Sequence, residues 1–113
     1  MTTEARPWGK YTILFTGTDC QVKRIEILPG RRLSLQSHQF RAEHWLITSG
    51  FGTAQVGDEM FEVKPGSTVD IPILTKHRIS SSPNSTLVFI EVQTGISFDE
   101  LDIERFEDDF GRA

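Results

Sequence analysis

The segment GRRLSLQSHQFRAEHWLITSG, residues 30–50, holds two short runs suited to β-strands and is bounded by glycine at both ends. Strand alternation puts every second residue on one face. The residues predicted to share one polar face are Arg32, Ser34, Gln36 and His38. Periodicity alone does not say whether this face lies in solvent or lines an interior.

Similar short runs recur from about Tyr11 to Val92, each closed by Gly, Pro, Asn or Ser. This spacing is typical of an all-β sandwich or barrel. The predicted strands cover residues 11–15, 21–28, 32–38, 43–48, 53–56, 60–63, 67–71, 77–80 and 86–92. A tight hairpin is predicted at Val56–Met60, because Gly and Asp tolerate the positive φ of such turns.

The end of the chain carries a different signal. Ser97-Phe98-Asp99-Glu100 reads as a capping box ahead of Leu101, which predicts a short helix or a 3₁₀ turn. We therefore expect one domain over residues 1–113, with a barrel at about 11–93 and a helical tail at about 97–113.

Composition excludes several classes of function. The net charge is −4 and the basic residues are scattered, so nucleic acid is not an expected partner. No apolar run approaches the roughly 20 residues needed to cross a bilayer, so a cytoplasmic protein without a membrane partner is expected. Cys20 is the single cysteine and is read as a small strand residue.

Two spacings resemble the motifs of cupins, which are small metal-binding β-barrels. Between Gly30 and Gly50, the spacing of Gln36, His38 and Glu43 resembles the first motif, with Gln in place of its first His. The run from Gly66 through Pro72 to His77 resembles the second, although Leu74 replaces its Gly and Ser81 its Asn. The resemblance implies a double-stranded β-helix, or jelly-roll barrel, whose polar face lines a cavity.

The resemblance also implies a ligand set for one divalent metal ion: Gln36, His38, Glu43 and His77. Two imidazoles, a carboxylate and an amide oxygen suit Zn²⁺, the expected metal, and also Mn²⁺, Co²⁺, Fe²⁺ or Ni²⁺. The alternative is that the histidines are unconnected and Glu43 is a solvated charge. His44 is expected on the outer face, away from the ligands.

A more specific resemblance covers residues 6–112. The segments that carry it are Arg6–Gly9, Val22–Ile25, Arg32–Gln36, Arg41–Trp45, Lys76–Arg78 and Phe106–Arg112. They are similar to the C-terminal cupin domain of type II phosphomannose isomerases, which are bifunctional mannose-6-phosphate isomerase/mannose-1-phosphate guanylyltransferases. The resemblance implies interconversion of mannose 6-phosphate and fructose 6-phosphate in GDP-mannose and polysaccharide precursor synthesis. Guanylyltransferase activity is not expected of these residues, because they contain no Gly-rich nucleotide loop.

This reaction needs cations for a phosphate dianion, for which arginine suits best. Arg32 is the first candidate, because it shares the predicted ligand face, and Lys23 and Arg112 follow. The base that moves the proton is not assigned. Two of three histidines in the family's stretch are replaced here by Gln39 and Phe40, which puts catalysis in doubt but not metal binding.

The alternative function is a non-isomerase cupin, which binds a sugar or other small ligand or acts on another substrate. Arg32 facing the cavity would favour the isomerase, and Phe40 filling it would favour the alternative. A homodimer is expected, because the run Tyr11–Phe15 is a candidate edge strand that pairing would protect.

Overall fold

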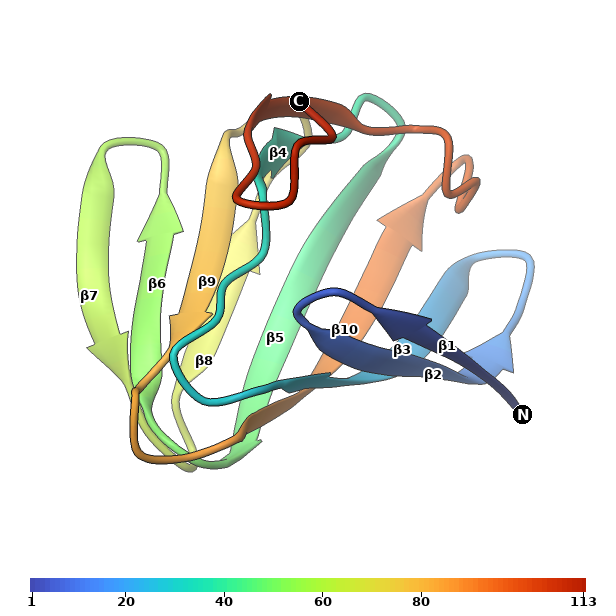
Figure 1. Ribbon diagram of the computed structural model, residues 1–113. Coiled ribbons are helices and arrows are strands. Elements are labelled where there is room, and N and C mark those ends of the chain that lie inside the picture. Colours follow the sequence, from blue (N-terminus) through green and yellow to red (C-terminus); the bar gives the residue numbers. More distant parts are fainter.

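The computed structural model describes residues 1–113 and contains β-strands but no helix (Figure 1). The strands are β1 (Thr2–Arg6), β2 (Gly9–Thr16), β3 (Cys20–Ile27), β4 (Leu35–Ser37), β5 (Arg41–Ser49), β6 (Gly52–Val56), β7 (Glu59–Val63), β8 (Thr68–Ile71), β9 (His77–Ser81), β10 (Leu87–Gly95) and β11 (Glu104–Glu107). One antiparallel sheet has the order β1-β2-β3-β10-β5-β8 and the other β11-β4-β9-β6-β7. No helix long and apolar enough to cross a membrane is present.

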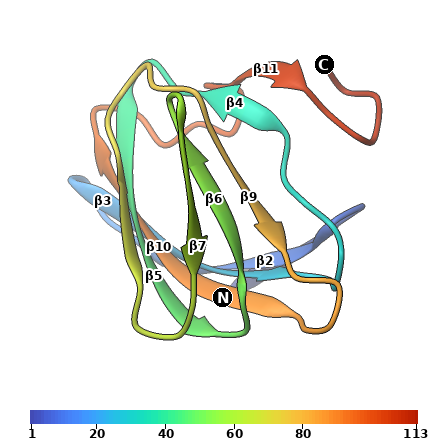
Figure 2. The ribbon, with the colours of Figure 1, turned by 90° about the vertical axis from the view of Figure 1, so that its left-hand side faces the viewer.

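The two sheets enclose one apolar core. Figure 1 shows β6 and β9 on the left and β5 and β10 to their right, and Figure 2 shows β4 and β11 at the top. Alternation turns every second residue of β5 inward, so Trp45 and Ile47 are almost fully buried. They form the core with Ile27, Ile79, Leu87 and Phe89. The all-β, single-domain architecture expected from the sequence is confirmed.

The tight turn predicted at Val56–Met60 joins β6 to β7. Val56 pairs with Glu59, and Gly57 has φ of 59°, a left-handed conformation that costs glycine little. The nine predicted strands all have counterparts, although the one expected over Arg32–His38 is reduced to Leu35–Ser37 and an isolated bridge at Arg32. Leu33 and Ser34 are both buried, so the alternation breaks at this point.

The short helix expected after Ser97 is absent, and residues 97–103 form a turn and irregular chain instead. The capping box is not formed, because the Glu100 carboxylate binds Lys23 instead. The hydrogen bonds present are turn-like: Asp99 N–H donates to Ser97 Oγ at 3.4 Å, and Leu101 N–H donates to Asp99 Oδ1 at 2.9 Å. The chain then enters β11, which pairs with β4. Figure 1 shows this C-terminal segment, residues 97–113 in red, running across the top of the barrel.

The strand expected at the sheet edge is not an edge. Thr2–Arg6 forms β1, which pairs with β2 along its first half, so β2 lies between β1 and β3. Sequence signals did not predict β1, because its exposed residues show no apolar alternation. An exposed edge at Tyr11–Phe15 was the reason for predicting a homodimer, and this reason no longer holds.

Candidate metal site and cavity

Three side chains that can bind a metal meet inside the barrel. His38 follows β4, Glu43 lies in β5 and His77 begins β9. Alternation along β5 turns Glu43 inward, and none of the three is more than 5% exposed. One ligand atom of each lies within 4.8 Å of the others.

The carboxylate of Glu43 faces both imidazoles, with Oε2 3.2 Å from Nε2 of His38 and Oε1 3.6 Å from Nε2 of His77. The Nδ1–H of His38 donates to the carbonyl oxygen of Asp102 at 2.6 Å, and that of His77 to Thr75 at 2.9 Å. A neutral ring held this way presents the lone pair of Nε2 to the carboxylate. A proton or a metal cation between these atoms satisfies both, so the donor set fits a divalent metal.

The buried groups differ in their preferred charge. Burial favours neutral Glu43, but the hydrogen bond with His38 and the charges of both histidines outweigh it and hold the pKa of Glu43 well below its ordinary value. Burial lowers the pKa of His77, which favours the neutral ring that binds metals. Burial and the charge of Glu43 raise the pKa of nearby Glu91 to about 8.

Trp45 links the two carboxyl groups. Its Nε1–H lies 3.2 Å from Glu43 Oε1 and 3.0 Å from Glu91 Oε1. Gln93 donates to the other oxygen of Glu91 at 2.8 Å, and Gln21 donates to Gln93 at 3.2 Å. Because every member is buried and hydrogen-bonded, this network fixes the orientation of Glu43.

Gln36, the fourth predicted ligand, lies opposite His77 in the β4–β9 pair and lines the same cavity as Glu43. Its amide nitrogen donates to Ser34 Oγ at 3.0 Å and to the Ser34 carbonyl at 3.3 Å. The amide oxygen is therefore the atom that Gln36 can offer to a cation.

A cavity of about 90 Å³ adjoins these residues. Its cationic lining residues are Arg6, Lys23, Arg41, Arg105 and Arg112. Lys23 pairs with Glu100, Arg41 donates to Glu43 at 3.1 Å, and Arg112 donates to Asp108 at 2.7 Å. Glu43, Glu91 and Glu100 also line the cavity, so the cations outnumber the acids there and are suited to an anionic ligand.

Arg105 is the least satisfied of these cations. Its Nε is the one buried side-chain nitrogen or oxygen that has no hydrogen-bond partner. Burial and the charge of Arg112 lower its pKa, opposed by Asp108. An anion in the cavity would supply the missing acceptor and offset the repulsion between the arginines.

The structure brings two of the three predicted phosphate residues to the cavity, Lys23 and Arg112. Arg32 does not reach it, contrary to the prediction that it shares the ligand face. Both ends of its guanidinium donate to Asp109 at 2.8 Å on the outside of the barrel. The reason is the break in alternation at Leu33 and Ser34, which reverses the direction of Arg32 relative to Gln36.

Sequence reasoning missed Arg6, Arg41 and Arg105 as cavity residues. Strand alternation could have predicted Arg41, because it lies two residues before Glu43 in one strand and must share its face. Arg105 gave no usable signal, because the C-terminal segment was expected to be helical and its position depends on β4–β11 pairing.

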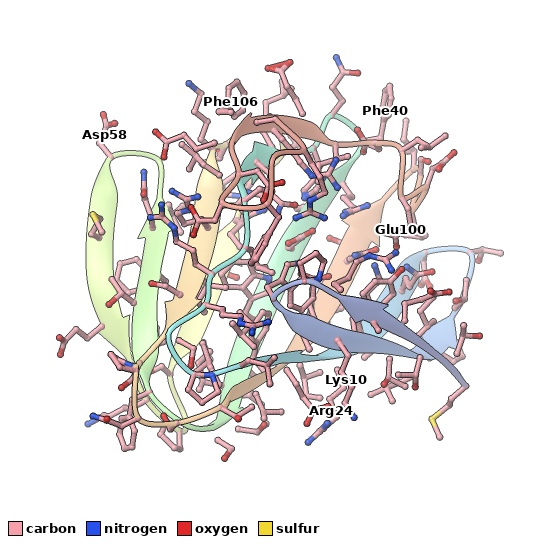
Figure 3. All side chains as sticks on the ribbon, in the orientation of Figure 1. Lys10, Arg24, Phe40, Asp58, Glu100 and Phe106 are labelled. Carbon is pink, nitrogen blue, oxygen red and sulfur yellow. The ribbon has the colours of Figure 1, made fainter.

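Phe40 does not fill the cavity. It is 45% exposed, and Figure 3 shows its side chain pointing away from the barrel interior. Gln39 is also exposed. His44 lies on the outer face as expected and pairs there with Asp70.

Two antiparallel sheets closed around a buried His, His and Glu cluster define a cupin. Solved structures agree on the fold. A cupin-2 domain protein from Rhodospirillum rubrum, Rru_A2000, superimposes with a TM-score of 0.77 at 23% identity, over 89% of this chain and 77% of that one. The capsular polysaccharide assembling protein CapF of Staphylococcus aureus superimposes with a TM-score of 0.81 at 24% identity, over 95% of this chain and 34% of that one.

Within this class, the chain belongs to the family of mannose-6-phosphate isomerase C-terminal domains, which matches residues 1–108. The xanthan biosynthesis protein XanB of Xanthomonas campestris pv. campestris (strain B100) is 44% identical over 96% of this chain and 23% of its own length. The alginate biosynthesis protein AlgA of Pseudomonas aeruginosa is also 44% identical, over 96% of this chain and 22% of its own length. The mannose-1-phosphate guanylyltransferase ManC of Salmonella typhimurium is 38% identical over 96% of this chain and 22% of its own length. The chain thus spans less than a quarter of the length of these relatives.

Proposed function

We propose that the protein binds one divalent metal ion, Zn²⁺ first among the candidates, through Gln36, His38, Glu43 and His77, and isomerises mannose 6-phosphate to fructose 6-phosphate. The observation that carries this proposal is the position of the His, His and Glu cluster beside a cavity lined by five cationic side chains. Family membership and relatives named for xanthan and alginate biosynthesis support a role in making polysaccharide precursors. The cytoplasm and a homodimer remain predictions.

The cationic residues have a definite task in this proposal. A phosphate dianion placed among Lys23, Arg105 and Arg112 would accept charge-assisted hydrogen bonds and direct the sugar end toward Glu43 and His77. A bound dication would polarise the sugar oxygens and stabilise an enediolate. The dication would be held by Gln36, the two histidines and Glu43. Trp45 and Arg41 would keep Glu43 in place.

Size limits what the described conformation can hold. Pockets that enclose drug-sized ligands measure about 300–1,000 Å³, so a cavity of about 90 Å³ admits only a few waters or a small anion. The C-terminal segment forms part of the wall through Glu100, Ile103 and Arg105. In this proposal the segment moves outward to admit substrate, which opens the ion pair between Glu100 and Lys23.

The small cavity and the absence of Arg32 from its lining also favour a second candidate. In it, the protein is a cupin that binds a sugar or other small ligand without isomerising it, or that acts on another substrate. The cations around the cavity favour a negatively charged ligand in this case too.

The deciding experiment assays conversion of mannose 6-phosphate to fructose 6-phosphate by the protein loaded in turn with Zn²⁺, Mn²⁺, Co²⁺ and Fe²⁺. Metal-stripped protein and Glu43→Gln are the controls. Turnover that needs metal and disappears in Glu43→Gln is the expected result. A protein that binds metal yet turns over nothing with any of the four would leave the ligand-binding function as the better one.

A further inference from the structure

The C-terminal segment contacts the metal cluster directly through Asp102. This residue lies just before β11, and β11 pairs with β4 so that Glu104 is opposite Ser37. Extending that antiparallel register places Asp102 beside Gln39, at the point where the chain leaves β4.

Asp102 accepts three hydrogen bonds from the adjacent loop. Its two carboxylate oxygens accept the backbone N–H groups of Gln39 at 2.9 Å and Phe40 at 3.0 Å. Its backbone carbonyl accepts Nδ1–H of His38 at 2.6 Å. One residue therefore fixes both the loop that carries His38 and the rotation of the His38 ring.

These contacts decide which nitrogen of His38 faces Glu43. With Nδ1–H bound to the Asp102 carbonyl, Nε2 is directed at the carboxylate 3.2 Å away. Hydrogen bonds of this kind to the outer nitrogen of a histidine ligand set its tautomer and orientation, and losing one typically costs 10–100-fold in metal affinity.

We infer that Asp102 is a positioning residue of the metal site, and that docking of residues 97–112 over the barrel and metal binding reinforce each other. The inference rests on the proposed metal binding by His38, Glu43 and His77. Because coupling between two binding events is reciprocal, a metal that binds more tightly when the segment is docked must also hold the segment more tightly.

The test compares wild type, Asp102→Ala and Glu104→Ala by chelator competition for Zn²⁺. Glu104 is a matched control, because it is an exposed acid two residues further along the same segment. Asp102→Ala keeps the carbonyl that accepts His38 Nδ1–H but removes the carboxylate that holds the amides of Gln39 and Phe40, so the loop that carries His38 is released. This variant is expected to bind Zn²⁺ about 10-fold more weakly than wild type, and Glu104→Ala within twofold of it. The visible spectrum of bound Co²⁺ should change in Asp102→Ala only, since it reports ligand geometry and not stability.

Equal affinity of wild type and Asp102→Ala overturns the inference, and so does an equal loss in Glu104→Ala. Absence of Zn²⁺ binding by wild type refutes the metal site itself, which distinguishes the two failures. If Asp102→Ala does not fold, hydrogen exchange of wild type decides. Zn²⁺ is expected to slow exchange at the amides of Gln39, Phe40 and residues 97–112, and unchanged rates there refute the coupling.

Discussion

Glu43 accepts hydrogen bonds from Arg41 at 3.1 Å and Trp45 at 3.2 Å while facing two imidazole nitrogens. Removing a carboxylate from water costs several kcal/mol unless partners compensate it. The hydrogen bond with His38 and the charges of His77 and His38 outweigh this cost and hold the pKa of Glu43 well below its ordinary value, while Arg41 and Trp45 fix its orientation. Glu43 therefore stays ionised at the position where a metal ligand must be ionised.

The first prediction concerns the two histidines His77 and His44. His77→Ala removes a donor from the buried cluster and should weaken Zn²⁺ binding by at least about 100-fold, since one of four ligands is lost. His44→Ala removes an exposed ring on the outer face and should leave affinity unchanged. Isothermal titration calorimetry with Zn²⁺ checks both, and stoichiometric tight binding by His77→Ala would refute the assignment.

The second prediction separates the cations inside and outside the cavity. Arg105→Ala should raise KM for mannose 6-phosphate by about 10–100-fold, because one charge-assisted hydrogen bond contributes roughly 1.5–3 kcal/mol. Arg32→Ala should leave KM unchanged, because the Arg32 guanidinium binds Asp109 outside the cavity. Steady-state kinetics of both variants is the measurement, and a KM effect confined to Arg32→Ala would contradict the placement.

The structure brings together the ligands that the motif spacing predicts but places Arg32 away from them, and the difference has a physical reason. His38 and Glu43 lie close together in sequence, at the short connection from β4 in one sheet to β5 in the other, so their separation is nearly set by local chain geometry. The direction of Arg32 depends on a bend at Leu33, where the backbone N–H donates to Ile79 O. That contact joins residues distant in sequence, and no local pattern reports it.

At the scale of elements, the C-terminal segment is held to the barrel by β4–β11 pairing and by ion pairs. Arg32 binds Asp109, and the buried Arg78 donates to Glu107 at 2.9 Å. Within the segment, the carboxylate of Asp108 accepts the backbone N–H of Arg112 at 2.8 Å and its Nε at 2.7 Å. These contacts shape the loop that places Arg112 at the cavity.

The third prediction is a pH dependence of this loop. Hydrogen bonds from the Arg112 side chain, opposed by burial and aided by its backbone N–H, lower the pKa of Asp108 to about 2. A lowered carboxyl pKa stabilises the loop above the ordinary value near 4, and this stabilisation is lost as pH falls toward 2. The amide NMR shift of Arg112 should therefore titrate with a midpoint of about 2 and lose this transition in Asp108→Asn. A midpoint near 4 would contradict the contact.

Elements were predictable where apolar alternation marks a half-buried strand, as in Cys20–Ile27 and Arg41–Ser49. The strands Thr2–Arg6 and Glu104–Glu107 could not be predicted from the sequence. They have no apolar face and are stabilised by pairing with β2 and β4. The predicted capping box at Ser97 gives two turn-like hydrogen bonds instead, to Ser97 Oγ and Asp99 Oδ1. The helix does not follow, because the chain instead crosses the barrel to pair with β4.

At the scale of the molecule, the barrel divides into an apolar half and a polar half. Trp45 and Phe89 close the apolar core, with ring centroids 5.0 Å apart, and Trp45 also contacts His77 at 5.8 Å. The candidate ligands lie on the polar side of this aromatic layer and come from strands of both sheets. A metal bound there would connect the two sheets, and its binding free energy would add to the stability of the whole domain.

The fourth prediction is a metal-dependent rise in the unfolding temperature. A ligand at 100 times its Kd stabilises the native state by about 2.7 kcal/mol, which for a domain of 113 residues corresponds to roughly 10 °C. Differential scanning calorimetry with Zn²⁺ should show this rise in wild type and in His44→Ala, with reversal by a chelator. His77→Ala should show little change, because the loss of one ligand removes the affinity while the apolar core is untouched. An equal rise of the unfolding temperature in His77→Ala would mean that the stabilising metal binds elsewhere. It would refute the assignment of His38, Glu43 and His77 as the metal centre.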